Sequence, residues 1–536
     1  MRYWIIAVCI CYTLSSCKFG GSQKVIVADT SITFDLAFNQ LFLDSADIEA
    51  YVEMNPNFTS FRDSYFDFYK ERNFSYAWLD EDGMGEQAAN FMNLLDNLLE
   101  EQRDSSIYEK RLRPLYDSLQ LIPSPWTKNV TIEKFTEAEL LLTGQFFRYA
   151  TKVYAGADMD VTQLGWFIPR KKIILTNVLD SLIQNKGRAI EQYEPLNKHY
   201  RRLEKMLVRY NEIEKNGRWD SIAFRQKSYQ LGDSSEVILQ IKNRLFATGD
   251  LPAMDSSLIF DSSLHKAIQQ FQKRHGWTAS GKVNSSLMND LNTPITEKIK
   301  KILINMERAR WMPAEFSGDF ILVNIPEFKL HVYEDGTHAY DMPVVVGKQA
   351  DNTVIFNGNI SYLVFSPSWH VPPGILKKEV LPGIQKDPNY LSKHNMVVEK
   401  YQGNTPIAVR QVPGKNNPLG GVKFMFPNSH NIYLHDTNNK NAFKQDKRSL
   451  SHGCIRVSDP EKLAVFALKD QPNFTLDSIR TSMKSGKEQY VTLKRKIPVL
   501  ITYFTAWVDS EGLLHIRNDL YGHDEKMAQK LFTKPE

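Results

Sequence analysis

The chain is 536 residues long, which is enough for two to four domains with hydrophobic cores of their own. Its 66 basic and 62 acidic side chains leave a formal net charge of only +4, which argues against a nucleic-acid binder and against a polybasic membrane anchor. Aromatic residues make up 12% of the chain, a content that suits a carbohydrate or peptide groove but that ordinary cores explain equally well.

The first 40 residues have the pattern of an export signal followed by a tether. A short apolar run, residues 4–14, is too short to span a bilayer of roughly 30 Å as a helix. It ends in Leu14-Ser15-Ser16-Cys17, which resembles the bacterial lipobox and implies a lipid on Cys17. We therefore expect a signal peptide at residues 1–16, a tether at 17–40, and a lipoprotein facing the periplasm of the cell envelope, with the outer membrane favoured. An ordinary cleaved signal with a chance cysteine is the alternative.

Residues 41–229 are expected to form an α-helical scaffold domain. Apolar residues recur at spacings of three and four in residues 135–142 and 181–207, with charged residues between them. No later segment of the chain is apolar enough to cross a membrane. No group of residues suited to catalysis stands out in this region. Its sequence therefore predicts a helical scaffold and no more specific function.

Residues 230–296 predict a small module of three helices. Amphipathic patterns mark the helices at residues 237–245, 264–271 and 287–291. The pattern from Leu264 to Asn292 resembles the peptidoglycan-binding helical repeat, although Ser280 stands where that family usually has Asp and Ser286 where it usually has Thr. These departures leave the fold intact, and the sequence leaves open whether the module binds cell wall or is purely structural.

From Phe320 onward the hydrophobic period changes to two, which is typical of strands. The expected strands are residues 320–325, 329–333, 342–346, 360–365, 421–426, 432–435, 499–503 and 513–516. Short strands separated by turn residues predict a mostly β domain, a sandwich or a barrel, over residues 297–510. An insertion at residues 372–413 is expected to cap it, since insertions of that length beside a site are often lids. Residues 511–536 would be a C-terminal extension.

Cys454 is the only cysteine outside the first 17 residues. A single thiol cannot form an internal disulfide, and one sulfur is too few for a structural zinc site, which leaves a buried inert cysteine or a nucleophile. A nucleophilic thiol needs a base, a tight turn and backbone N–H donors, and His435, His452 and Gly453 supply these parts within twenty residues. Because residues alternate along a strand, Tyr433 should point to the same side as His435. The sequence therefore predicts an acyl-transfer site.

The segment from His435 to Arg456, with its Ser-His-Gly-Cys-Ile-Arg box, resembles the signature of the L,D-transpeptidase (YkuD-type) catalytic domain. Flanking stretches that support the resemblance are residues 305–313, 369–375, 417–420 and 423–428. Together with the scaffold and the three-helix module they resemble the long, multi-domain Gram-negative form of that family. Residues 352–354, Asn-Thr-Val, depart from the Arg-x-Thr-Pro pattern of related chains.

The resemblance implies a role for each residue of the box. Cys454 would be the nucleophile and His435 the proton donor and acceptor. His452 and the backbone N–H of Gly453 would support the oxyanion. The implied substrate contacts are Arg456, Ser451, Tyr433 and Trp369, of which Arg456 could instead form a structural ion pair and Trp369 could instead be part of the core.

The resemblance also implies a reaction. The thiol attacks the carbonyl of the third residue of a tetrapeptide stem and expels D-alanine, and an amine of another stem resolves the thioester into a 3→3 crosslink. The expected partners are peptidoglycan stems, a membrane through the lipid on Cys17, and carbapenem-type inhibitors, with no metal or organic cofactor and no nucleic acid. Alternatives are an L,D-carboxypeptidase, which uses water as the acceptor, a wall-binding structural lipoprotein with an inactive catalytic domain, and a generic cysteine protease.

Overall fold

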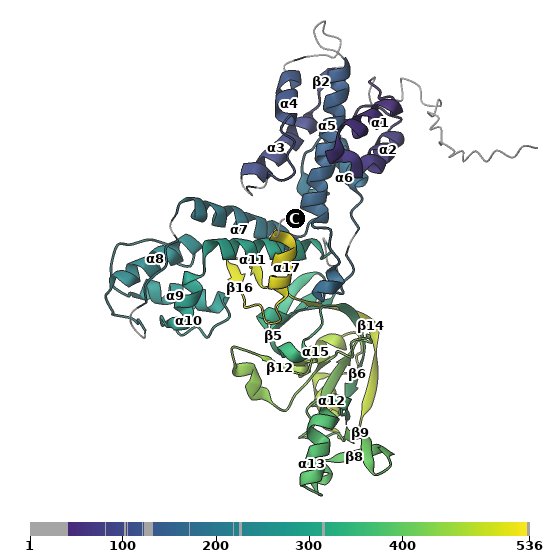
Figure 1. Ribbon diagram of the computed structural model, residues 1–536. Helices are drawn as coiled ribbons and strands as arrows, with labels where there is room; N and C mark the ends of the chain where they lie inside the picture. Colours follow the sequence, from purple (N-terminus) through teal and green to yellow (C-terminus); the bar gives the residue numbers. More distant parts are fainter. Residues whose placement is uncertain are drawn as a thin grey trace, which may run out of the picture. The chain divides into compact units, whose positions relative to one another are not determined.

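The computed structural model describes residues 41–532, apart from 81, 101–102, 104, 121, 123–131, 171, 218, 225–227 and 314–316. Cys17 and the predicted signal peptide and tether lie outside the described residues. The chain divides into two units (Figure 1). The first comprises Met1–Asn90, Glu109–Phe147 and Leu179–Arg188, and the second comprises Phe91–Tyr108, Arg148–Val178 and Ala189–Glu536. Among the described residues, no helix combines the length and the hydropathy that a bilayer crossing requires.

The first unit is helical, in agreement with the predicted scaffold. Its elements are α1 (Ser45–Met54), α2 (Arg62–Glu71), the hairpin β1 (Leu79–Asp80) and β2 (Gly83–Met84), α4 (Leu112–Gln120), and parts of α3 (Glu86–Glu100), α5 (Ile132–Ala150) and α6 (Leu175–Gln184). The buried carboxylate of Glu139, on α5, accepts hydrogen bonds from the backbone N–H groups of Ala77 and Trp78 and from the Tyr69 hydroxyl. These bonds join α2, the segment before β1 and α5 around one buried polar group.

In the second unit, α7 (Lys198–Lys215) packs against α11 (Ile295–Arg310), and α17 (His523–Phe532) packs against α11 as well. The Arg308 guanidinium on α11 forms a 2.6 Å ion pair with Asp524 on α17. The predicted C-terminal extension is therefore tied into the fold of this unit through a buried charge pair.

The three-helix module within this unit forms as predicted, with α8 (Glu236–Thr248), α9 (Ser262–Arg274) and α10 (Ser285–Asn292). Ser235 caps α8 by accepting a hydrogen bond from the backbone N–H of Val237, and Gly249 ends it at φ +84. The Ser280 hydroxyl accepts hydrogen bonds from the Gln272 side chain (3.1 Å) and from the backbone N–H of Lys282 (3.3 Å). Ser280, one of the two departures from the repeat, therefore stabilises a turn.

The β domain is a nine-stranded sheet with the strand order β12-β5-β13-β11-β10-β6-β14-β3-β4. Its strands are β3 (Phe320–Asn324), β4 (Lys329–Glu334), β5 (Thr337–Gly347), β6 (Asn357–Phe365), β10 (Val422–Met425), β11 (Leu434–His435), β12 (Ser449–Ser451), β13 (Ile455–Val457) and β14 (Gln489–Thr502). Because β4 also pairs with β5, the order closes on itself, which confirms the barrel-like architecture. Also present are α15 (Pro460–Ala467), α16 (Leu476–Lys484) and the hairpin β15 (Ala506–Val508) and β16 (Leu514–Ile516).

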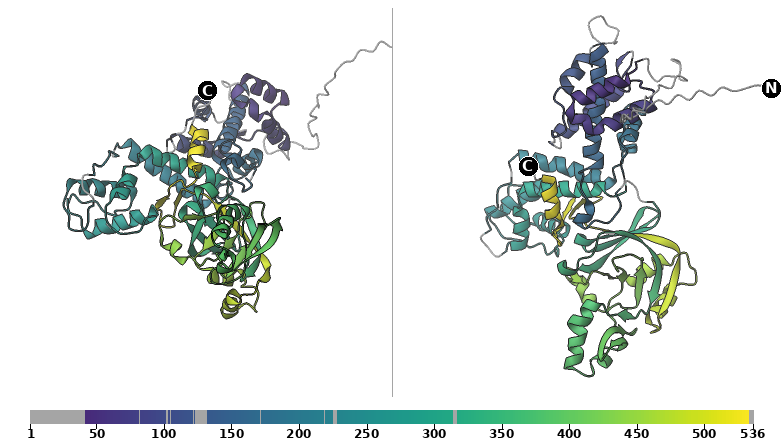
Figure 2. Two further views of the ribbon diagram at one scale, coloured as in Figure 1. Left: turned by 60° about the horizontal axis from the view of Figure 1, so that its bottom comes forward. Right: turned by 45° about the vertical axis from the view of Figure 1, so that its right-hand side comes forward.

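The predicted insertion is a small subdomain with a sheet of its own. A sheet of order β7-β9-β8 (Trp369–His370, Thr405–Gln411, Met396–Gln402) lies beside α12 (Pro373–Ile375), a π-helical turn (Leu376–Val380), α13 (Leu381–Lys386) and α14 (Tyr390–Lys393), as Figures 1 and 2 show. Val371, Leu376, Val380 and Val409 form its core, and Trp369 packs against them. The helical stretch near residue 376 was expected from the sequence, and the sheet was not.

Candidate active site

Three adjacent strands of the closed sheet carry the predicted site. The register pairs Lys423 on β10 with His435 on β11, and His435 with Arg456 on β13. Directly paired residues present their side chains on the same face of a sheet, so these three side chains lie side by side. The alternating residues Leu434 and Ile455 are fully buried in the hydrophobic core. The polar face of β10, β11 and β13 is thus the floor of the site.

Cys454 lies immediately before β13 and is partly exposed. Its thiol donates a hydrogen bond to the backbone carbonyl of Asn431, with a sulfur-to-oxygen distance of 3.7 Å. Burial raises the pKa of the Cys454 thiol, although hydrogen bonds from Tyr433 and the charges of Lys423 and Arg456 work in the opposite direction. The thiol is therefore protonated at neutral pH and needs a base when it attacks.

The surroundings of His435, the predicted base, fix its tautomer. Its Nδ1 lies 2.5 Å from the backbone carbonyl oxygen of Asp436. A carbonyl can only accept a hydrogen bond, so Nδ1 carries the proton and Nε2 keeps its lone pair. Burial, assisted by the charges of Arg456 and Lys423, lowers the pKa of His435 to about 3. The imidazole is consequently neutral across the physiological pH range, with the lone pair of Nε2 free to accept a proton.

The carboxylate of Asp436 holds the end of β11 in place. One oxygen accepts a hydrogen bond from the backbone N–H of Gly421 (2.8 Å), and the other accepts from the backbone N–H of Thr437 and from Lys440 Nζ (both 2.7 Å). Gly420 has φ +61, and a Cβ at that position would collide with the same carboxylate. Asp436 thus fixes the backbone carbonyl that selects the His435 tautomer.

The turn before Cys454 is closed by Ser451. The Ser451 hydroxyl donates to the Cys454 carbonyl (2.6 Å) and accepts from the Gly453 N–H (3.3 Å). Gly453 has φ +109, a conformation that favours glycine. Ser451 is buried with its hydroxyl engaged inside the turn, where it supports the turn rather than facing a substrate. His452 is exposed. The oxyanion roles of His452 and Gly453 stay predictions.

A chain of hydrogen bonds connects this turn to the C-terminal segment of the protein. The Thr353 hydroxyl donates to the Gly453 carbonyl (2.8 Å) and accepts from the Gly347 N–H (2.9 Å). The Tyr521 hydroxyl donates to the Gly347 carbonyl (2.6 Å) and accepts from the Thr353 N–H (3.4 Å). Tyr521, which sequence reasoning did not identify, is therefore a positioning residue two contacts away from the nucleophile.

Replacing Tyr521 with phenylalanine should slow acylation of Cys454 while leaving the protein folded. The change leaves the Gly347 carbonyl and the Thr353 N–H without this buried partner, at a cost of about 1–3 kcal/mol. We expect an acylation rate by a carbapenem about three- to tenfold lower, with an unchanged pH profile, since no titrating group is altered. Tyr340→Phe, which removes a 3.3 Å hydrogen bond to Lys462 at the surface, is the matched control. Equal rates for the two variants would contradict a positioning role.

The remaining predicted contacts lie in two places. Arg456 shares the face of His435, and among the described residues its buried Nε has no hydrogen-bond partner. Tyr433 lies beside His435, with their ring centroids 5.6 Å apart. Trp369 belongs to the insertion and packs on its core. Apart from these residues, a group on β4 and β5, His331, His338 and Asp341, could hold a metal ion.

Three segments of the chain match protein-family descriptions. Residues 318–474 match the L,D-transpeptidase catalytic domain (YkuD), residues 63–207 match a scaffold domain, and residues 234–291 match a "putative peptidoglycan binding domain". The chain thus contains the catalytic domain and the peptidoglycan-binding domain that the sequence patterns indicated. The three matches fall in the regions predicted to be a helical scaffold, a three-helix module and a mostly β domain.

A curated protein of Haemophilus influenzae, described as a "Putative L,D-transpeptidase", is 33% identical over 243 residues, which are 42% of this chain and 49% of that protein. The match spans about half the length of that relative. Among solved structures, an L,D-transpeptidase from Stackebrandtia nassauensis is 14% identical with a TM-score of 0.23, covering 52% of this chain and 97% of that one. L,D-transpeptidase 3 from Mycobacterium tuberculosis, in complex with a faropenem-derived adduct, is 13% identical with a TM-score of 0.18, covering 34% and 60%.

Proposed function

We propose that this chain, which contains the L,D-transpeptidase catalytic domain at residues 318–474, is a peptidoglycan L,D-transpeptidase with the Cys454 thiol as its nucleophile. The observation that carries the proposal is the state of His435. It lies on β11, which pairs with β13, the strand that begins directly after Cys454; it is neutral, and its Nδ1 proton is held by the Asp436 carbonyl. Nε2 is thereby left to take the thiol proton.

In the first half-reaction, Cys454 Sγ attacks the carbonyl carbon of the third residue of a tetrapeptide stem. Nε2 of His435 takes the thiol proton as the carbon–sulfur bond forms. The tetrahedral intermediate then breaks its carbon–nitrogen bond, and the same proton passes to the departing amine of D-alanine. The product of this half-reaction is a thioester on Cys454.

In the second half-reaction, an amine of a neighbouring stem attacks the thioester. Nε2 of His435 now accepts the proton of the attacking amine and returns it to the sulfur as the carbon–sulfur bond breaks. The new amide joins the third residues of two stems, and the enzyme is restored. His435 acts in both half-reactions, which is why its tautomer and charge matter more than those of the surrounding groups.

The positive groups around the thiol supply the electrostatics that this chemistry needs. Lys423 and Arg456 both interact with the sulfur and stabilise negative charge there without forming a permanent thiolate. Both are partly buried, so their charges are less screened than surface charges. We propose that Arg456 also meets the carboxylate of the stem and that carbapenems acylate the same sulfur.

Product analysis tests the proposed function. The protein is incubated with purified tetrapeptide stems, and the products are separated and sequenced by mass spectrometry. We expect dimers joined through their third residues, with one D-alanine released per crosslink and none formed by Cys454→Ala. Tripeptide without dimer would instead show the L,D-carboxypeptidase. If neither product forms, the wall-binding structural lipoprotein becomes the better explanation.

We also propose that the chain is a lipoprotein of the cell envelope, held at a membrane by a lipid on Cys17 and facing the periplasm. The lipobox-like sequence Leu14-Ser15-Ser16-Cys17 supports this proposal. Metabolic labelling with a fatty acid should mark the wild-type chain and not Cys17→Ala, and an unlabelled wild-type chain would contradict it.

A further inference from the structure

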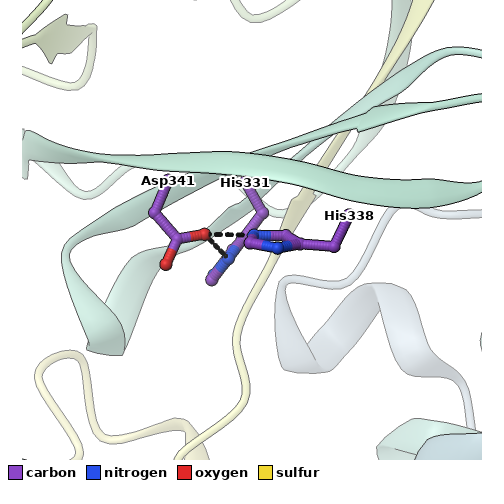
Figure 3. A group of neighbouring side chains, drawn as sticks. All are labelled: His331, His338 and Asp341. Carbon is purple, nitrogen blue, oxygen red and sulfur yellow. Dashed lines mark hydrogen bonds and ion pairs between the residues drawn. The ribbon is translucent and has the colours of Figure 1, made fainter. Parts of the chain in front are cut away.

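The hairpin formed by β4 and β5 brings two histidines and an aspartate together away from the thiol. The register pairs His331 on β4 directly with Asp341 on β5, and it pairs His338 with Tyr333, two residues beyond His331. All three side chains therefore project from one face of the hairpin, as Figure 3 shows. Neither the catalytic mechanism nor the peptidoglycan-binding module uses these residues.

The three side chains converge on one carboxylate oxygen. Oδ1 of Asp341 lies 2.7 Å from His331 Nδ1 and 2.6 Å from His338 Nε2 (Figure 3). One ligand atom from each residue lies within 4.8 Å of the other two. Two imidazole nitrogens and one carboxylate oxygen are a common ligand set for zinc and related transition-metal ions.

A buried carboxylate orients the first histidine. His331 Nε2 lies 2.9 Å from Glu327 Oε2, and Glu327 is only 8% exposed. With Nε2 bound to Glu327, the His331 ring presents Nδ1 to the convergence point. A carboxylate that holds the second ring nitrogen of a histidine is the usual support of metal-binding histidines, because it fixes the ring and raises its basicity.

The cluster opens to solvent-accessible space. His331, His338 and Asp341 line a cavity of about 960 Å³, whose wall also includes His199, Arg202 and Trp507. A metal held by three protein ligands keeps a further position for water or an anionic group, and this cavity has room for either. The cavity also provides a path by which the ion can reach the three ligands.

We propose that His331 Nδ1, His338 Nε2 and the Asp341 carboxylate bind one divalent transition-metal ion of the zinc type, with the remaining position open to the cavity. On binding, the ion replaces the protons that these two nitrogens share with Asp341, and those protons pass to solvent. Ligands at about 2.0–2.1 Å from a tetrahedral ion stand farther apart than hydrogen-bonded atoms do, so the side chains must spread slightly. His338, whose side chain is 48% exposed, can move to allow this.

Charged groups surround the cluster. Lys329 Nζ lies 3.3 Å from the other oxygen of Asp341 and 3.6 Å from Glu327, while His199 and Arg202 line the same cavity from α7.

The test is a zinc titration of the full chain, purified metal-free, with its four cysteines changed to serine so that no thiol binds the ion. We expect one zinc ion per chain by calorimetry and elemental analysis at pH 8. His338→Ala and the isosteric Asp341→Asn should each weaken binding at least tenfold. The matched control, His370→Ala, removes an exposed histidine 3.8 Å from Glu399 and should change nothing.

Two outcomes would overturn the proposal. One is a chain whose circular dichroism shows it folded but which takes up no zinc at pH 8. The other is zinc uptake that His338→Ala and Asp341→Asn leave intact, or that His370→Ala weakens by as much as they do. The readout is metal content and affinity, so it stands apart from the transpeptidase reaction: a chain that makes no crosslinks could still bind zinc.

Discussion

Changing Cys454 to serine is expected to abolish acylation of the protein by a carbapenem. The wild-type protein should gain one drug mass in intact-protein mass spectrometry, and the variant should gain none over the same time. The reason lies in the nucleophile: a thiol of ordinary pKa about 8.5 gives up its proton far more readily than an alcohol does. A hydroxyl at position 454 is far harder to deprotonate than a thiol, and we expect a rate lower by about 10³-fold or more.

A matched control separates this site from general thiol reactivity. Cys17→Ser removes the other cysteine expected in the mature chain and should leave the adduct unchanged. An adduct that persists in Cys454→Ser, or that Cys17→Ser removes, would contradict the assignment of the nucleophile. A folded wild-type protein that gains no mass would show a closed or inactive site and would favour the wall-binding structural lipoprotein.

Sequence spacing was enough to predict that Cys454 and His435 belong to one site, because both lie on short, strongly patterned segments. The expected strand at residues 432–435 was correct in placing Tyr433 and His435 together, but the strand itself covers only Leu434–His435. The preceding residues form a loop in which Asn428 hydrogen-bonds the Phe426 and Ile432 carbonyls and Asn431 adopts φ +55. This loop aims the Asn431 carbonyl at the thiol, a contact that no periodic pattern encodes.

The groups that the sequence did not reveal act through tertiary contacts. Lys423 reaches the site because β10 pairs with β11, and Tyr521 reaches it through Gly347 and Thr353, although 67 residues separate Cys454 from Tyr521 along the chain. Asp436 could have been suspected, since it follows His435 directly and a carboxylate there can fix the strand end. Tyr521 carries no local signal, because a lone tyrosine after a turn is common in any fold.

The same distinction between local sequence patterns and tertiary contacts explains why the fold of the three-helix module could be predicted and the sheet of the insertion could not. The three-helix module was predictable since Leu264, Ile268 and Phe271 form a clear apolar stripe that is fully buried in the structure. The sheet of the insertion was not, because most of the side chains of β8 are exposed and its pattern is polar. Strands that bury little apolar surface leave little periodicity in the sequence, and β8 is held by its pairing with β9 and by Met396 and Val398, which pack on the core of the insertion.

Changing His435 to alanine should cost more activity than changing His452 to alanine. His435 moves a proton in both half-reactions, which is worth about 10²–10⁴-fold in rate, whereas His452 is exposed and could supply at most one oxyanion donor, worth roughly 10²–10³-fold.

The pH profile of acylation between pH 5 and 9 is the second readout. The pKa of His435 is lowered to about 3, so the wild type should keep its base neutral, and hence its rate, down to pH 5. His435→Ala depends on thiolate that forms unaided, and because burial raises the pKa of Cys454, its residual rate should climb up to tenfold per pH unit across this range. Equal losses for the two variants, or a wild-type rate that falls with a midpoint near pH 6.5, would contradict the proposal that His435 is a buried neutral base for Cys454.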